Sequence, residues 1–450
     1  MNTHPKANAW QLQKPAARGS AVGAQYLAPL RLRHNISVKK FIQFTTTIFL
    51  LSCLTASACH AQSRDVLCRD GVGDFEAEFH TGVKVHVGAG RNQELAARVC
   101  DASLSWADQT LVLTSAVAEL DIDAFGVDMG VGPPVVALQV KKSRGDCCMA
   151  YSIYTLQQPP VLVRRIAGGE YFSASDTDLD GRVEIWTDDA AAVDGFENLR
   201  LRDLDFPPPI VLRFTRDKLQ DVGAEFRPYF DQKIVAERAK LNPQDLADFK
   251  ASDGQLTPGS IPPARLSRLR SAKMKVLEIV WSYLYSGREK DAWIALGDMW
   301  PAADLDRIRT AITNARARGI RSQVDAVLTA TRAGHAGLAK IFDGTTIITS
   351  TPELAPKGAK PPTPITPPTA ILMERLPPMT PAEQELAKLE STLKLVIDSA
   401  GKVRSVEVLG NPEKIDELLL QSTTNWKFIP AYNADQPVAS QILLGVSLRK

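Results

Sequence analysis

Three aspartates at alternate positions form the segment of this chain best suited to bind a metal ion. They lie in Asp176-Thr-Asp178-Leu-Asp180, and Gly181 follows directly. Carboxylates at the first, third and fifth positions, with glycine at the sixth for a tight turn, can surround a hard cation such as Ca²⁺. The seventh position supplies a backbone carbonyl and the ninth a carboxylate. We therefore predict a Ca²⁺ site, with an ion-free acidic turn as the alternative. Its ligands would be Asp176, Asp178, Asp180, Arg182 and Glu184.

The residues on both sides of this acidic loop favour β-strands. An EF-hand would carry a glutamate at the twelfth position, where this chain has Thr187. Tyr171-Phe172 precede the loop and Ile185-Trp186 follow it, and all four residue types are common in strands. The loop resembles the calcium loop of FG-GAP or VCBS β-propeller repeats. That resemblance implies an ion between two strands of a blade, with Phe172 as the upstream aromatic residue.

A weaker copy of the pattern occurs at Asp121-Ile-Asp123-Ala-Phe125-Gly126. Phe125 stands where a third acid would be, so we expect no metal there. One good loop and one poor loop do not make a closed propeller, which needs at least four blades. We therefore expect a partial propeller or a β-sandwich.

Strand patterns in residues 62–216 predict an antiparallel β domain. Residues 74–79 and 82–87 alternate in polarity around His80-Thr81-Gly82, which predicts a hairpin. Three later strands begin directly after prolines, which a strand tolerates at its first residue but not in its centre. These predicted strands are residues 135–140, 161–166 and 210–214.

The exported part of the chain has an even number of cysteines, which favours disulfides over metal ligands. They are Cys68, Cys100, Cys147 and Cys148. Three connectivities are open to them. Because a bond between the neighbours Cys147 and Cys148 would be strained, we expect two long-range links that join Cys68 and Cys100 to that pair.

Residues 1–61 have the features of a leader and signal peptide. Lys39-Lys40 precede an apolar stretch, residues 41–54, and small residues follow up to Ala61. Three outcomes stay open: cleavage after Ala61, lipidation of Cys53, or an uncleaved anchor, for which the stretch is barely long enough. All three predict export to the periplasm, and the last two predict membrane association.

Residues 217–345 change to a helical period, which predicts a helical bundle. A second helix is expected around Trp293, ending near Trp300-Pro301, and a third begins at Asp304. The apolar face of the first, long helix comprises Leu266, Leu269, Val276, Val280 and Leu284. Residues 346–384 are rich in proline and predict a stiff polyproline II linker without helix or β-ladder.

Residues 385–450 alternate in polarity on both sides of one short helix. Residues 393–398 and 406–408 predict two strands joined by a turn at Gly401. Asn411-Pro412 predicts a helix start, because Asn caps helices and Pro is favoured at the first helical position. Trp426 and Phe428 then alternate on a third strand, and residues 442–448 on a fourth. The order is ββαββ.

This order, together with Trp426-Lys-Phe428-Ile-Pro430-Ala, Asp398-x-x-Gly401-Lys-Val and Pro437-Val438, resembles the TonB C-terminal domain. The resemblance implies an outer-membrane receptor or another envelope protein as partner. It also implies binding by addition of an extended segment to a sheet edge, through main-chain hydrogen bonds. The expected partner-binding strand contains Val438, Ser440, Ile442, Leu444 and Val446.

The composition excludes wholesale disorder, with 44% apolar and 23% charged residues. A net charge of +2, without a repeated basic and aromatic stripe, argues against a nucleic-acid partner. The chain lacks G-x-S-x-G, phosphate-loop, H-E-x-x-H and dinucleotide motifs, so we predict that it is not an enzyme.

We expect a multidomain α+β protein: an N-terminal antiparallel β domain, a central helical bundle, a Pro-rich linker and a C-terminal TonB-like ββαββ domain. The predicted function is non-enzymatic, namely energy coupling or scaffolding at an outer-membrane transport system. The alternative is a calcium-stabilised periplasmic structural or adhesion protein whose TonB-like domain is only an interaction module.

Overall fold

The computed structural model describes most of the chain beyond the predicted leader. The described residues are 66–92, 97–145, 147–201, 204, 207–257, 259–328, 390–409, 420, 422–433 and 436–447, with the short segments 348–349, 365–366 and 368–372. The predicted leader with Cys53, and the helix expected at Asn411-Pro412, lie outside them. The fold is mixed α+β with several antiparallel sheets, as predicted. No helix in these ranges is long and apolar enough to cross a membrane.

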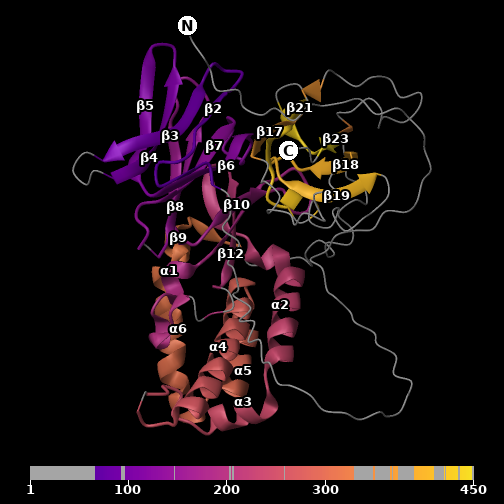
Figure 1. The fold of residues 1–450 in the computed structure, drawn as a ribbon. Helices are drawn as coiled ribbons and strands as arrows, with labels where there is room; N and C mark the ends of the chain where they lie inside the picture. Colours follow the sequence, from indigo (N-terminus) through magenta and orange to yellow (C-terminus); the bar gives the residue numbers. More distant parts are fainter. Residues whose placement is uncertain are drawn as a thin grey trace, which may run out of the picture.

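Two antiparallel sheets pack face to face near the start of the described chain (Figure 1). The first has the order β2 (Phe75–Glu78), β3 (Lys84–Asn92), β4 (Ala97–Trp106) and β5 (Gln109–Val117). The second has the order β1 (Cys68–Arg69), β6 (Glu119–Val127), β7 (Val135–Lys141), β8 (Met149–Thr155) and β9 (Leu162–Gly169). Val85 and Leu104 from the first sheet share a core with Ile122 and Leu138 from the second. The hairpin predicted around His80-Thr81-Gly82 is confirmed, because β2 pairs with β3.

A third sheet carries the acidic loop. Its order is β10 (Phe172–Ser175), β11 (Glu184–Asp188), β12 (Pro209–Thr215), β13 (Lys218–Asp221) and β14 (Ala326–Val327). Phe172 stacks on Tyr151 of β8 at 4.8 Å between ring centroids, which holds β10 against the second sheet. The three strands predicted after prolines are confirmed as β7, β9 and β12.

Five longer helices extend from one end of the sheets (Figure 1). They are α2 (Arg227–Lys240), α3 (Pro243–Lys250), α4 (Pro263–Tyr285), α5 (Glu289–Met299) and α6 (Leu305–Arg318), preceded by the short α1 (Ala190–Val193). The apolar face predicted for the long helix is buried at Leu269, Val276, Val280 and Leu284. Val276 and Val280 share one core with Ile185 and Leu212. The helices and the third sheet therefore form a common hydrophobic interior.

The C-terminal part forms a fourth sheet, of order β15 (Ile348–Thr349), β23 (Ser440–Ser447), β18 (Glu390–Ile397) and β19 (Val403–Leu409). Leu393, Leu395 and Ile397 alternate inward and meet Trp426 and Phe428. This is the core that the alternation predicts.

The expectation that residues 346–384 form no β-ladder was wrong at three places, the first of which is the pairing of β15 with β23. Ile365–Thr366 (β16) pairs with β21 (Ala431–Asn433), which also pairs with β22 (Gln436–Val438). Thr369–Leu372 (β17) pairs with β20 (Lys427–Ile429). These short stretches contain no proline, so each residue keeps the backbone N–H that a ladder needs.

The expected disulfide pairing was also wrong. The structure joins Cys68 to Cys100, with 5.9 Å between their Cα atoms, and Cys147 to Cys148. Cys68 on β1 and Cys100 on β4 come from different sheets and are both fully buried in the core between them. Cys147 and Cys148 lie in the connection between β7 and β8. The packing of the two sheets therefore decides the pairing.

Candidate metal centre

The acidic loop connects β10 to β11, the strand–loop–strand setting that its flanking residues predict. Ser175 pairs with Glu184 at the base of the loop. Asp176, Asp178 and Asp180 each direct one carboxylate oxygen to a common point, so that these atoms all lie within 4.8 Å of one another. The loop bends through left-handed backbone at Leu179 (φ 58°) and Gly181 (φ 83°). The glycine at the sixth position thus has the role that the pattern assigned to it.

Two oxygens of this cluster are buried without a hydrogen-bond partner in the described part of the chain. They are Oδ1 of Asp176 and Oδ1 of Asp178. Asp176 is only 1% exposed. A buried carboxylate oxygen without a hydrogen-bond partner raises the free energy of the folded protein. Carboxylate oxygens arranged in this way can act as ligands of a hard cation. The residues present therefore fit Ca²⁺.

Carboxylate oxygens of the same aspartates also fold the loop, and both oxygens of Asp180 bind Arg182. Oδ2 of Asp176 accepts a hydrogen bond from the Gly181 N–H at 3.1 Å. Asp180 accepts the Arg182 N–H at 2.8 Å and also forms an ion pair with the Arg182 guanidinium. The backbone at Arg182 is thereby held beside the acidic cluster.

Glu184, the predicted ninth-position ligand, is committed to other partners. Its side chain is fully buried, and Oε2 accepts the Thr177 N–H at 3.2 Å. Oε1 accepts a hydrogen bond from Arg213 of β12 at 3.3 Å. Among the described residues, the convergent group consists of the three aspartates. Glu184 instead stabilises the loop through its hydrogen bonds with Thr177 and Arg213.

The electrostatics of the loop favour neutralisation of its acids. Burial raises the pKa of Asp176 to about 7, and the nearby Asp398 adds to the rise, whereas a hydrogen bond from Ser399 opposes it. Burial likewise raises the pKa of Glu184 to about 8. A bound cation stabilises the ionised form of its carboxylate ligands and displaces their protons.

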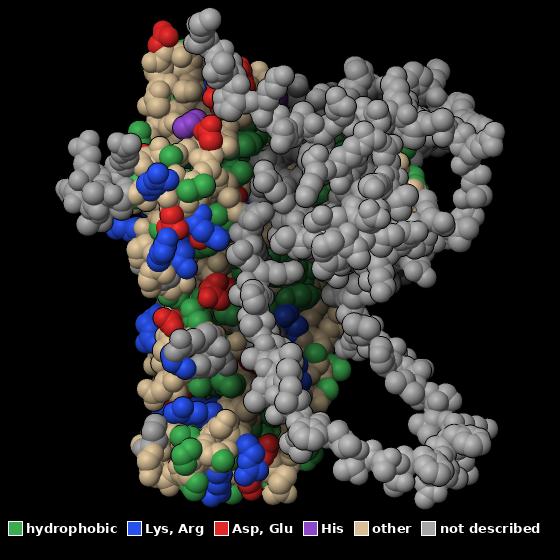
Figure 2. Space-filling view, viewed as in Figure 1, with side chains coloured by type: hydrophobic (Ala, Val, Ile, Leu, Met, Phe, Trp, Pro, Cys, Tyr) green, Lys and Arg blue, Asp and Glu red, His purple; other side chains and the backbone are tan. Residues whose placement is uncertain are grey.

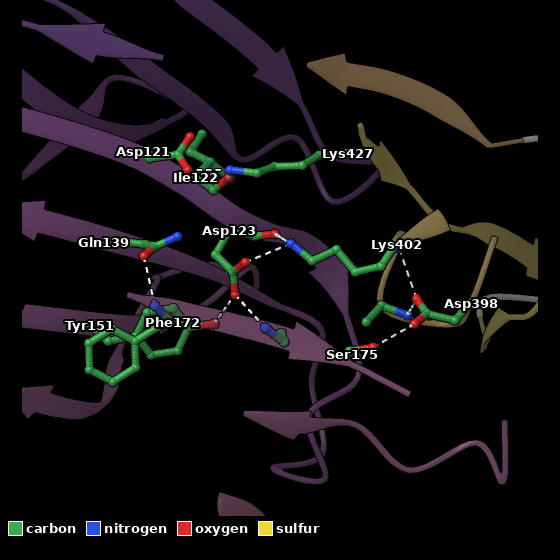
Figure 3. Close-up of polar contacts among 12 residues, drawn as sticks. Asp121, Ile122, Asp123, Gln139, Tyr151, Phe172, Ser175, Asp398, Lys402 and Lys427 are labelled. Atoms are coloured by element: carbon green, nitrogen blue, oxygen red, sulfur yellow. Dashed lines mark hydrogen bonds and ion pairs between the residues drawn. The ribbon is translucent and has the colours of Figure 1, made fainter. Parts of the chain in front are cut away.

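A turn of the C-terminal sheet lies against this loop. Oδ2 of Asp398 accepts a hydrogen bond from Ser175 Oγ at 3.0 Å (Figure 3). It also accepts one from the Asp176 N–H at 3.1 Å. Ser399 Oγ donates to Oδ2 of Asp176 at 2.9 Å. Arg404 donates to Ser175 Oγ at 3.1 Å and to the Thr177 carbonyl at 2.9 Å. The sequence pattern assigned only a turn to these residues, because contacts so distant in sequence leave no local signal.

The weaker acidic copy lies within strand β6, and its acids bind lysines. Lys402 Nζ lies 2.6 Å from Oδ1 of Asp123, and Lys427 forms an ion pair with Asp121 (Figure 3). Asp123 also accepts hydrogen bonds from Tyr151 Oη at 2.6 Å and from the Ala174 N–H at 2.7 Å. These pairs join the turn after β18 and strand β20 to the second sheet.

The side chains of Lys402 and Lys427 are largely buried in this interface. Figure 2 shows the charged side chains that are exposed on one face of the molecule. On the face shown there, basic and acidic side chains are interspersed over the sandwich and the helices. The described surface on this face therefore shows no extended field of one sign.

The predicted partner-binding strand is divided in two. Val438 belongs to β22 and pairs with Ala431, whereas Ser440, Ile442, Leu444 and Val446 belong to β23. On one side β23 pairs with β18 along its whole length. On its other side, Ile348 and Thr349 of β15 pair in parallel with Ser440 and Gln441. This side of β23 therefore accepts an extended segment from the same chain.

Comparison with known proteins supplies no relative. No family model matches the chain, and no curated protein or solved structure matches it either. The function has to be argued from the residues and their geometry.

Proposed function

We propose that this is an exported, non-enzymatic cell-envelope protein whose C-terminal module binds an extended segment of an outer-membrane partner by strand addition at β23. The signal-like leader supports export. The Cys68–Cys100 bond fits an oxidising compartment. The resemblance to the TonB C-terminal domain supports the kind of partner.

The observation that carries the proposal is the pairing of β15 with β23. An extended segment from a distant part of the chain adds to the sheet at Ser440 and Gln441. Main-chain hydrogen bonds provide most of the affinity in strand addition, so the same edge suits an extended segment of another protein. Such a partner would displace β15.

A test uses this competition. A photo-crosslinking residue at Gln441, which pairs with Thr349 and is partly exposed, would be placed in the chain in cells, and crosslinked products would be identified after separation of the two membranes and the periplasm. Ile348→Pro removes a backbone N–H from β15 and should raise the yield of a specific outer-membrane adduct. Ala359→Pro, outside the described strands, is the matched control and should leave the yield unchanged. Strand addition at this edge would be contradicted if no adduct formed. It would also be contradicted if the adduct yield were the same in Ile348→Pro, in Ala359→Pro and in the unmodified chain.

The acidic loop favours a second candidate function, that of a calcium-stabilised structural or adhesion protein. Its support is the convergence of Asp176, Asp178 and Asp180 with two buried oxygens that lack partners in the described chain. Under this function the protein should gain stability from Ca²⁺ and form no outer-membrane adduct through β23. Fractionation separates the roles further, because an energy-coupling protein must be held in the inner membrane and a scaffold need not be.

A further inference from the structure

The acidic loop and the C-terminal turn use the same residue for two purposes. Asp176 contributes one carboxylate oxygen to the cluster with the other two aspartates, and its Oδ1 is buried without a hydrogen-bond partner in the described chain. Its Oδ2 accepts the hydrogen bond of 2.9 Å from Ser399 in the C-terminal turn. A cation held by Oδ1 would fix the orientation of this carboxylate, and that orientation is what the Ser399 contact needs.

The loop backbone also forms part of the interface. The Asp176 N–H donates to Asp398, and the Thr177 carbonyl accepts from Arg404. Both backbone groups lie at the start of the loop, next to the first cluster aspartate. Ordering of the loop by an ion therefore presents these groups to the C-terminal turn at a smaller entropic cost.

The charges of Asp176 and Asp398 also favour docking of the C-terminal turn when a cation is bound. Asp398 is completely buried, and its carboxylate lies beside that of Asp176. Two acids so close repel each other when both are ionised. Asp398 itself is not a free ligand, because Ser175, Asp176, Ala400 and Lys402 all donate hydrogen bonds to it. A divalent cation on the loop side of Asp176 would offset the repulsion without competing for Asp398.

We infer that Ca²⁺ bound by Asp176, Asp178 and Asp180 strengthens docking of the turn from Asp398 to Arg404, so that occupancy of the loop controls how firmly the C-terminal module is held against β6 and β10. This inference rests on the calcium loop of the second candidate function and adds a means of regulation to the strand addition proposed first. When Ca²⁺ is absent, the module is released more often, and β23 moves away from the rest of the protein with it.

Thermodynamic reciprocity makes the coupling testable. If Ca²⁺ strengthens docking by some factor, weakening of the docking contacts must lower the affinity for Ca²⁺, up to that same factor. Arg404 and Ser399 touch the loop but are not cation ligands. Substitutions there separate coupling from simple loss of the site.

The experiment is calorimetric titration of CaCl₂ into the exported full-length chain and its variants. Ser399→Ala and Arg404→Ala should each weaken Ca²⁺ binding, and together they should do so by about tenfold, within the usual range of coupling between sites. Lys394→Ala is the matched control, since Lys394 lies in the same sheet and pairs with Glu407, away from the loop. Its dissociation constant should equal that of the unmodified chain.

Hydrogen exchange supplies a second readout. Addition of Ca²⁺ should slow amide exchange in residues 397–404 of the unmodified chain, and Asp178→Asn should abolish this protection. Equal dissociation constants for the docking variants and the unmodified chain would overturn the coupling and leave the calcium site intact. No Ca²⁺ binding by the unmodified chain would overturn both, while strand addition at β23 would be judged by its own crosslinking test.

Discussion

Ser399 donates a hydrogen bond of 2.9 Å to Asp176, although 223 positions of sequence separate the two residues. This contact places the turn of the C-terminal sheet directly on the first carboxylate of the acidic loop. A site that the sequence presents as a local loop is thereby part of an interface. Its properties depend on two segments that are distant in sequence, and the predictions below follow from this arrangement.

Calcium should stabilise the folded protein through the three clustered aspartates. A ligand at about 100 times its dissociation constant adds about 2.7 kcal/mol to the free energy of unfolding. Thermal unfolding with CaCl₂ or with a chelator should show this gain, and Asp178→Asn should remove it. Asp217→Asn, an exposed aspartate in the turn between β12 and β13, should keep the full gain. A gain that persists in Asp178→Asn would exclude the cluster as the site.

Gly126→Ala should weaken the attachment of the C-terminal module to β6. A Cβ at this position would lie 2.2 Å from Tyr432 Oη, and the residue has a left-handed φ of +73°. Left-handed backbone costs an alanine about 1–2 kcal/mol, and the clash should add about 1–3 kcal/mol. Gly132→Ala shares the left-handed strain, with φ +95° and nothing within 4 Å.

Urea unfolding of the two variants compares these costs, and the difference between them isolates the clash. Hydrogen exchange in residues 427–433 should rise only in Gly126→Ala. Equal destabilisation and equal exchange in the two variants would show that Tyr432 does not approach Gly126 in solution.

Stability should fall as pH rises from about 4 to about 6, in part because of Asp189. Burial raises the pKa of Asp189 from 3.8 to about 6, although hydrogen bonds from Tyr285 and the Ile320 N–H oppose the rise. Between these values the folded protein keeps a proton that the unfolded chain has lost. The contribution is full below the unfolded pKa and is lost as pH rises through the folded pKa, by about 3 kcal/mol.

Asp189→Asn cannot ionise, so it should flatten this part of the pH dependence. Urea unfolding at intervals between pH 4 and pH 7 measures the slope for both proteins. Asp217→Asn serves again as the exposed control and should keep the slope. An unchanged slope in Asp189→Asn would mean that this carboxyl is already ionised in the folded protein at low pH.

The two disulfides should differ in their effect on stability. The Cys68–Cys100 bond closes a separation of 32 residues, and a bond that closes a loop of this order contributes about 4 kcal/mol by restricting the unfolded chain. The Cys147–Cys148 bond joins adjacent residues and restricts almost no chain. Removal of the first pair with serines should lower the midpoint of urea unfolding substantially, and removal of the second should leave it nearly unchanged. Peptide mapping without reduction checks the pairing itself.

Local patterns predicted a large share of the fold. Leu393, Leu395 and Ile397 alternate with Lys394, Val396 and Asp398, and the structure buries all three. The helical period of residues 263–285 matches α4, and the acidic loop lies between two strands as its flanking residues indicated. These features depend on residues a few positions apart, where backbone geometry alone decides which side chains share a face.

Contacts between segments that are distant in sequence could not be predicted from local patterns, because only the tertiary structure brings those segments together. The pairing of Cys68 with Cys100 follows from the packing of two sheets, and the ladder at Thr369–Leu372 follows from the position of β20. The sequence identified Asp121 and Asp123 only as a poor copy of a metal loop, whereas the fold pairs them with Lys427 and Lys402. Buried charges need partners wherever the chain brings them, and only the completed packing determines which partners those are.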